Sequence, residues 1–250
     1  MKTPFLSIII PAYNEALRLP QSLRQIDAFV RAQDYQSEII VVENGSSDGT
    51  YQIACGMQGD IPALKVMHED VRGKGWAVKQ GMLAARGAYR FICDADLSMP
   101  IGEVPRFLPP VLTDAPIAIA SREAPGAVRY DEPQSRHLIG RAFNWLVRVL
   151  LLHGLQDTQC GFKCFRADVA ERVFPLVSIS GWTFDVEALF IAHKMGYPIR
   201  EVPIPWYYHA NSKIKVGRDA LQMGTDLLKI RWKALRGHYH AEKDSPHTSR

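Results

Sequence analysis

The first half of the chain alternates short apolar segments with longer helical patterns, and this alternation constrains the fold most. Each apolar segment is rich in β-branched residues and ends at turn residues, as parallel strands buried on both faces do. We expect strands at Leu6–Ile10, Glu38–Val42, Leu64–His68, Arg90–Cys93 and Ile117–Ala120. Helices are expected between them at Arg18–Arg31, Thr50–Met57, Lys74–Arg86 and roughly Glu103–Leu112. The alternation predicts an α/β fold with a mostly parallel, Rossmann-like sheet flanked by helices.

The second half begins with a polar loop over residues 122–135, and a helix of unusual composition follows at about 136–153. Its polar residues form one narrow stripe, and almost all the others are large and apolar. The apolar part, Leu138–Leu152, is too short to cross a hydrocarbon layer of ~30 Å. This helix is therefore interpreted either as lying in a membrane interface or as a buried core helix. Further helices are expected at Val169–Phe174 and Thr183–Lys194, and a strand at Ile199–Pro203.

The C-terminal part is basic and amphipathic. Of the 250 residues, positions 211–250 hold nine Lys and Arg against four Asp and Glu, whereas the whole chain has a net charge of only +4. We expect a basic amphipathic helix at 216–237 and a flexible tail at 238–250. The mild overall charge, without a zinc-finger, RNA-binding or helix-turn-helix signature, argues against a nucleic-acid partner.

The remaining composition places the chain among ordinary globular proteins. With 47% hydrophobic and 22% charged residues it is neither disordered nor fibrous. No apolar run reaches the length of about 20 residues that a membrane-spanning helix needs, and Pro11 interrupts the one early apolar run, so no signal peptide is expected. The four cysteines are interpreted as reduced thiols of a cytoplasmic protein, and their spacing does not favour a structural zinc.

Two carboxylates stand directly after a predicted buried strand, in the segment Asp94-Ala95-Asp96. Ligands of parallel α/β sheets bind beyond the carboxyl ends of the strands. Two carboxylates separated by one residue can share a divalent cation, which keeps its other positions for water and substrate phosphates. We therefore interpret Asp94 and Asp96 as ligands of Mg²⁺ or Mn²⁺.

Three further polar motifs follow strands or precede a helix at the same edge, at Pro11–Glu15, Glu43–Thr50 and Arg72–Gly75. They supply acceptors, a flexible cation and turn glycines, which a nucleoside diphosphate requires. The candidate donor-binding residues are Pro11, Tyr13, Glu15, Glu43, Asp48, Lys74 and Asp94.

In order along the chain, these motifs resemble those of the family 2 inverting glycosyltransferases, in particular of the polyprenyl-phosphate hexosyltransferases, which include dolichyl-phosphate mannose synthases and dolichyl-phosphate β-glucosyltransferases. The resemblance spans about residues 5–215, and its motifs are Pro11–Glu15, Gly45–Thr50, Gly73–Gly75, Asp94–Ser98, Ser121-Arg122, Asp157–Lys163, Trp182–Glu187 and Ser212–Ile214. It implies a GT-A fold over residues 1–215, a nucleotide-sugar donor and a divalent metal. One departure is Glu43-Asn44, where such enzymes usually have Asp-Asp, and it leaves the donor open between UDP-glucose and GDP-mannose.

A polyprenyl or dolichyl phosphate acceptor needs cations rather than a base, because the second ionisation of a phosphate lies near pH 6. The candidate acceptor-phosphate residues are Arg122, Arg136, Arg141 and Lys213. Asp94, Asp96, Arg122 and Asp185 are the candidate catalytic residues, and Asp185 is either a capping residue or an acceptor-positioning one.

Two alternatives stay open. A soluble transferase with a hydroxyl acceptor would need a base, for which Asp185 or Glu187 is the candidate, and a module without activity would bind only the nucleotide sugar or a membrane. For the lipid acceptor we expect peripheral attachment to the cytoplasmic face of a membrane, either alone, with a membrane-protein partner or as a homo-oligomer.

Overall fold

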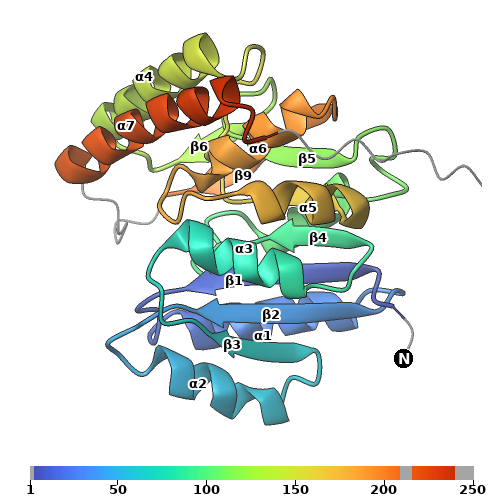
Figure 1. Ribbon diagram of the computed structural model, residues 1–250. Helices are drawn as coiled ribbons and strands as arrows, with labels where there is room; N and C mark the ends of the chain where they lie inside the picture. The colour runs from blue at the N-terminus through green and yellow to red at the C-terminus, as the bar shows by residue number, and fades with distance from the viewer. Residues whose placement is uncertain (1–2, 209–215, 240–250) are drawn as a thin grey trace, which may run out of the picture.

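The protein is described here by a computed structural model that covers residues 3–208 and 216–239 (Figure 1). Its main sheet has seven strands in the order β3-β2-β1-β4-β7-β5-β8. The strands are β1 (Leu6–Ala12), β2 (Ser37–Glu43), β3 (Leu64–His68), β4 (Tyr89–Ile92), β5 (Ile117–Ser121), β7 (Lys163–Arg166) and β8 (Ile199–Pro203). All pairs are parallel except those of β7, which is antiparallel to both β4 and β5. The mostly parallel sheet predicted from the alternation is confirmed.

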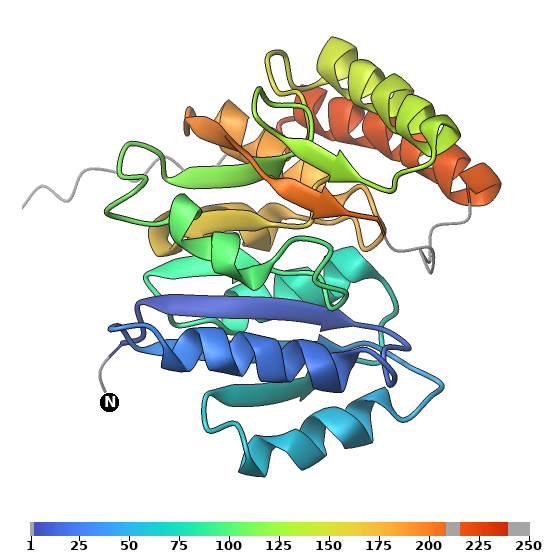
Figure 2. The same ribbon diagram turned by 180° about the vertical axis from the view of Figure 1, so that it is seen from behind.

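Helices cover both faces of this sheet (Figures 1 and 2). One face carries α1 (Leu19–Arg31), α2 (Thr50–Gly56) and the 3₁₀ helix η2 (Ile101–Phe107); the short 3₁₀ turn η1 (Met57–Gly59) follows α2. The other face carries α3 (Lys74–Ala84), α5 (Ala167–Val173), the 3₁₀ turn η3 (Phe174–Leu176) and α6 (Phe184–Lys194). The two layers bury separate apolar clusters.

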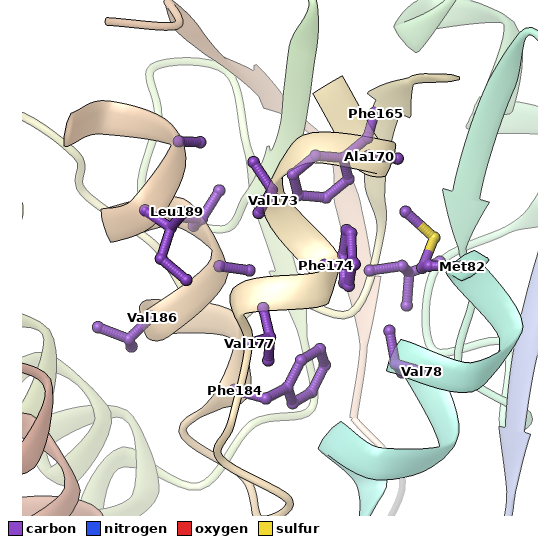
Figure 3. Packing of buried hydrophobic residues seen from close by; sticks show 14 of the residues in the cluster. Val78, Met82, Phe165, Ala170, Val173, Phe174, Val177, Phe184, Val186 and Leu189 are labelled. Carbon is purple, nitrogen blue, oxygen red and sulfur yellow. The ribbon is translucent and has the colours of Figure 1, made fainter. Parts of the chain in front are cut away.

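The division into two clusters follows from the alternation of side chains along each strand. On β1, Ile8 and Ile10 belong to the cluster under α1, whereas Ile9 belongs to the cluster under α3. In the second cluster Val78 and Met82 of α3 lie close to Phe174 (Figure 3). The resulting layer holds the carboxyl ends of β1, β2, β4 and β5 at one edge of a rigid sheet.

Two long helices, α4 (Gln134–Leu150) and α7 (Val216–Leu235), lie side by side near the β8 end of the sheet (Figures 1 and 2). Each buries part of its surface in the core, through Val147 on α4 and through Leu227 and Ile230 on α7. Each also exposes large apolar side chains, namely Leu138, Ile139, Trp145 and Val149 on α4 and Leu221, Leu228, Trp232 and Leu235 on α7. We call this exposed set the α4–α7 apolar face. In the described ranges, no helix is both long enough and apolar enough to cross a bilayer.

Several sequence expectations need correction. Strand β7 and the small parallel sheet of β6 (Val128–Tyr130) and β9 (Pro205–Tyr207) were not expected. The segment predicted as the helix Glu103–Leu112 is the 3₁₀ helix η2, which contains Pro105.

The predicted flexible tail was wrong at its start. Tyr239 is buried, its ring packs edge-on against Phe190 of α6, and its hydroxyl donates a hydrogen bond to Glu187. Its aromatic ring therefore joins the core rather than a solvated tail. Residues 240–250 and Lys213 lie outside the described residues.

Candidate active site

The two carboxylates of the acidic motif lie just beyond the end of β4. The Lys74 ammonium, on the first residue of α3, is 2.7 Å from Oδ1 of Asp94. Oδ1 of Asp96 accepts a hydrogen bond of 3.0 Å from the backbone N–H of Ser98. Although burial works against its charged form, Asp94 and Asp185 together raise the pKa of Lys74. The structure thus brings together Lys74, Asp94 and the Asp96 loop, as the sequence predicts.

A glycine makes room for Asp94. A Cβ atom placed on Gly161 would lie 2.1 Å from Oδ2 of Asp94, closer than any non-bonded contact allows. The segment that contains Gly161 therefore passes directly against this carboxylate. Among residues 3–208 and 216–239, no group of three or more His, Cys, Asp or Glu is arranged to hold a metal. Two carboxylates fit a cation such as Mg²⁺, which retains water and phosphate oxygens at its other positions.

Replacement of Gly161 by alanine is expected to displace the Asp94 carboxylate and to lower turnover at this site by about a hundredfold, because a misplacement of about 1 Å in a catalytic site has effects of that size. The turnover of G161A is measured beside that of Gly102→Ala, since a Cβ at Gly102 meets open space. A G161A protein that turns over like G102A would contradict the close contact between Gly161 and Asp94.

Behind the acidic motif lies a buried ion pair. Nζ of Lys163, on β7, is 3.1 Å from Oδ2 of Asp185, which stands in the first turn of α6. Lys163 also donates a hydrogen bond to the carbonyl of Cys160. Burial raises the pKa of Asp185, against the opposing effect of Lys163 and Lys74. In the sequence analysis Lys163 is only the last residue of the Asp157–Lys163 motif and has no role of its own, although a lysine within a strand that pairs on both sides needs a buried partner.

The donor motifs that follow β1 and β2 hold each other in place. The Glu15 carboxylate accepts two hydrogen bonds from Arg18, and the Glu15 backbone N–H donates to Oγ1 of Thr50. The Asp48 carboxylate accepts from the backbone N–H groups of Ala16 and Thr50. Glu15 and Asp48 therefore shape the loops rather than point freely into solvent.

An aromatic side chain and an arginine complete this corner of the site. The Arg72 guanidinium lies over the Tyr13 ring, 5.6 Å from its centre. The two residues belong to different motifs, one after β1 and one before α3. The structure therefore joins the first and third donor motifs at one place.

Glu43 faces inward. Its side chain is 1% exposed, Oε1 accepts a hydrogen bond from the backbone N–H of Ser46, and Oε2 lies 2.6 Å from Nδ1 of His68. The hydrogen bond that the His68 imidazole donates to the Glu43 carboxylate raises the pKa of His68, whose side chain is 45% exposed beside Tyr51. Of this pair, the His68 imidazole is therefore the group that reaches the surface. The sequence analysis did not single out His68.

The second residue of the unusual pair has a different partner. The side-chain amide of Asn44 donates a hydrogen bond of 3.1 Å to the carbonyl of Gly73. Asn44 therefore ties the end of β2 to the loop that carries Lys74. The amide does this without adding a charge near the carboxylates of the site.

Among the acceptor-phosphate candidates, Arg122 is already paired. Its guanidinium forms a two-point ion pair with Asp157, with distances of 2.7 Å to Oδ2 and 3.0 Å to Oδ1, and lies over the Trp206 ring. Despite burial, Arg122 lowers the pKa of Asp157 to about 2. The Asp157 side chain is fully buried. Arg122 is thus fixed by an internal partner.

The other acceptor candidates differ in position. Arg141 lies exposed on α4, whereas the Arg136 side chain is outside the described residues. Glu187, the second candidate base, is fully buried and accepts hydrogen bonds from Ser178, Ile179 and Tyr239. This arrangement favours a structural role for Glu187.

Comparisons with known proteins identify the family of the chain. The model of the family "Glycosyl transferase family 2" matches residues 7–174. The chain is 33% identical to a dolichyl-phosphate beta-glucosyltransferase of Dictyostelium discoideum, over 93% of this chain and 76% of the relative. It is 35% identical to the protein of that name from Drosophila melanogaster, over 90% of this chain and 74% of the relative.

Solved structures support the same fold. Glucosyl-3-phosphoglycerate synthase from Mycobacterium tuberculosis in complex with UDP has a TM-score of 0.65 and 21% identity, over 92% of this chain and 80% of that chain. Mannosyl-3-phosphoglycerate synthase from Rubrobacter xylanophilus has a TM-score of 0.66 and 17% identity, over 99% of this chain and 79% of that chain. The fold is GT-A, as expected. With the family match over residues 7–174 and relatives above 30% identity along most of its length, the chain belongs to glycosyltransferase family 2.

Proposed function

We propose that the protein transfers a hexose from a nucleoside diphosphate sugar to the phosphate of a polyprenyl or dolichyl lipid, with inversion at the sugar carbon. The observation that carries this proposal is the cluster of Lys74, Asp94 and Asp96, found in a chain whose relatives named dolichyl-phosphate beta-glucosyltransferase match it over nine-tenths of its length. The names of these relatives favour glucose, and therefore UDP-glucose, over GDP-mannose as the donor.

Asp94 and Asp96 are proposed to hold Mg²⁺ or Mn²⁺. A solved complex of the Mycobacterium tuberculosis synthase contains Mn²⁺ and UDP-glucose, which supports a divalent ion in this fold. Such an ion, when bound, stabilises the negative charge of the departing diphosphate. Lys74 is placed to neutralise the same charge, because its ammonium already lies against Asp94.

The acceptor requires no general base under this proposal, because a lipid phosphate is largely ionised at neutral pH. Asp185 then has a positioning role: its carboxylate forms an ion pair with Lys163 and lies near Lys74. The raised pKa of Asp185 also supports the second candidate function, transfer to a hydroxyl group with Asp185 as base.

The α4–α7 apolar face is proposed to lie on the cytoplasmic surface of a membrane, where the lipid acceptor is found. Two tryptophans, Trp145 and Trp232, are about half exposed on this face, and tryptophan favours the membrane–water interface. The basic residue Lys229 stands on the same helix as Trp232, and the guanidinium of Arg236, the residue after the helix, lies over the Trp232 ring. Both would add attraction to anionic lipid. A membrane-protein partner or a second copy of the chain would cover the same face as an alternative.

A product assay tests the proposed reaction. The protein is incubated with Mg²⁺ or Mn²⁺, labelled UDP-glucose or GDP-mannose, and polyprenyl phosphate in detergent, and the lipid is extracted into organic solvent. Label in the organic phase that depends on both metal and lipid phosphate is the expected result. Transfer of the labelled sugar to an added hydroxyl acceptor, with release of the nucleoside diphosphate and without a lipid product, would favour the second function. No turnover with any donor would leave only a binding module.

Membrane attachment has a separate test. The double variant Leu228→Ser with Trp232→Ser is expected to weaken flotation with liposomes by about tenfold or more, because two exposed apolar side chains no longer enter the interface. Replacement of Lys229, Lys233 and Arg236 by Gln should weaken binding to anionic liposomes in a salt-dependent way. Unchanged flotation of both variants would remove α7 from the membrane contact.

A further inference from the structure

A small polar pocket lies between α4 and the segment that follows it. It is lined by Glu123, Arg141, Asn144, Arg148 and Gln156 and has a volume of about 50 Å³. The three α4 residues follow i, i+3 and i+7 spacing, so they share one face of the helix. One water molecule needs on the order of 10–15 Å³ of such space. The pocket therefore suits a group the size of a phosphate rather than a nucleotide or a sugar ring.

The pocket holds two arginines whose charge is not neutralised within the described residues. Neither Arg141 nor Arg148 has an ion-pair partner there, and Nε of Arg148 is buried without a hydrogen-bond partner. Because a buried N–H donor is normally satisfied, this orphan points to a ligand that accepts a hydrogen bond.

The other lining groups agree with an anion. The Glu123 carboxylate also lines the pocket, but it lies 2.5 Å from the Arg129 guanidinium and 3.2 Å from Nε2 of His137. Arg129 therefore offsets the negative charge that Glu123 would otherwise set against a bound anion. Oδ1 of Asn144 accepts from Thr158, which leaves the side-chain NH₂ as a further donor.

We propose that Arg141, Asn144 and Arg148, with Gln156, form a binding site for a phosphate group, either free or on a lipid headgroup. Guanidinium groups pair phosphate oxygens in two-point fashion, which an ammonium does not do. The same helix exposes Leu138, Trp145 and Val149, so a phosphate attached to an acyl or prenyl chain would find apolar surface beside the pocket. Arg141 is also one of the acceptor-phosphate candidates, so for a prenyl phosphate this site deepens the proposed function and rests on it. Phosphate binding itself requires neither donor nor turnover, so it is tested separately from sugar transfer.

Calorimetric titration of the full chain with inorganic phosphate, at constant ionic strength and without donor, tests the site. The variant Arg148→Gln is expected to bind phosphate at least about tenfold more weakly than the wild type, and Arg148→Lys should recover only part of the loss. The matched control is Arg24→Gln, an exposed arginine on α1. The unfolding temperature of R148Q without phosphate shows whether the variant is folded.

Vesicles separate the two sources of phosphate. Flotation is compared between phosphatidylcholine vesicles and vesicles that also contain phosphatidic acid. If R148Q loses both phosphate binding and the preference for phosphatidic acid, the site takes a lipid headgroup; if only binding in solution is lost, it takes free phosphate. Equal behaviour of folded R148Q and wild type in both assays would overturn the proposal.

Discussion

Asp96→Ala is expected to reduce sugar transfer by about a thousandfold or more while the fold stays intact. The variant removes one of the two carboxylates proposed to hold the divalent ion, and such an ion supplies several kcal/mol of stabilisation to a charged transition state. The hydrogen bond that the Asp96 side chain makes in the structure is to the backbone N–H of Ser98, so little stability depends on it. Transfer of label to the organic phase and the unfolding temperature are the two measurements.

Metal binding gives a second readout for the same variant. Mn²⁺ titrated in the presence of UDP should bind to the wild-type protein and much more weakly to D96A, whereas Asp34→Asn, an exposed carboxylate on the loop after α1, serves as the matched control. Wild-type turnover and wild-type Mn²⁺ binding in a folded D96A protein would refute the assignment of Asp96 as a metal ligand.

The fold was predictable where local pattern decides it. The first five strands, β1 to β5, were expected within one or two residues of their observed bounds, because each is a short apolar run that turn residues close. Strand β7 was not expected, because Lys163 and Arg166 interrupt its apolar pattern and its partners β4 and β5 are far away in the sequence. Asp185 supplies the opposite charge that a buried lysine needs there, and the sequence does not reveal that contact.

The sequence predicts which motifs of the site come together, but it does not predict which atoms within them pair. Parallel strand ends share an edge, so the approach of Lys74 to the Asp94 loop follows from topology alone. The orientation of Glu43 does not follow, since its longer side chain turns to His68 on the next strand. In the same way, Arg122 looks like an available phosphate ligand until its partner Asp157, 35 residues later, is placed.

Asp157→Ala is expected to destabilise the protein by about 3–5 kcal/mol, because removal of one partner from a buried ion pair leaves the other charge uncompensated. For a chain of this size that corresponds to an unfolding temperature lower by roughly 10 °C. Asp168→Ala is the matched control: Asp168 pairs with Arg166 at 2.6 Å, but both side chains are about half exposed, so the loss should stay below about 1 kcal/mol.

The pH dependence of the same pair has a definite sign. The folded pKa of Asp157 is about 2, below its usual value of 3.8. A lowered carboxyl pKa stabilises the folded state above the unfolded pKa, and this contribution is lost as pH falls from about 4 toward 2. The D157A variant should therefore show a smaller loss of stability than the wild type over that interval in acid-unfolding curves.

A double variant separates the structural role of Arg122 from a role with the acceptor. Because apolar residues can replace a buried ion pair at little cost, Arg122→Met with Asp157→Leu should be more stable than D157A. If Arg122 also holds the acceptor phosphate, this double variant is folded but has a KM for polyprenyl phosphate raised by tenfold or more. Unchanged KM in the folded double variant would limit Arg122 to its ion pair. Wild-type stability of D157A would instead contradict the ion pair itself and leave Arg122 available to the acceptor.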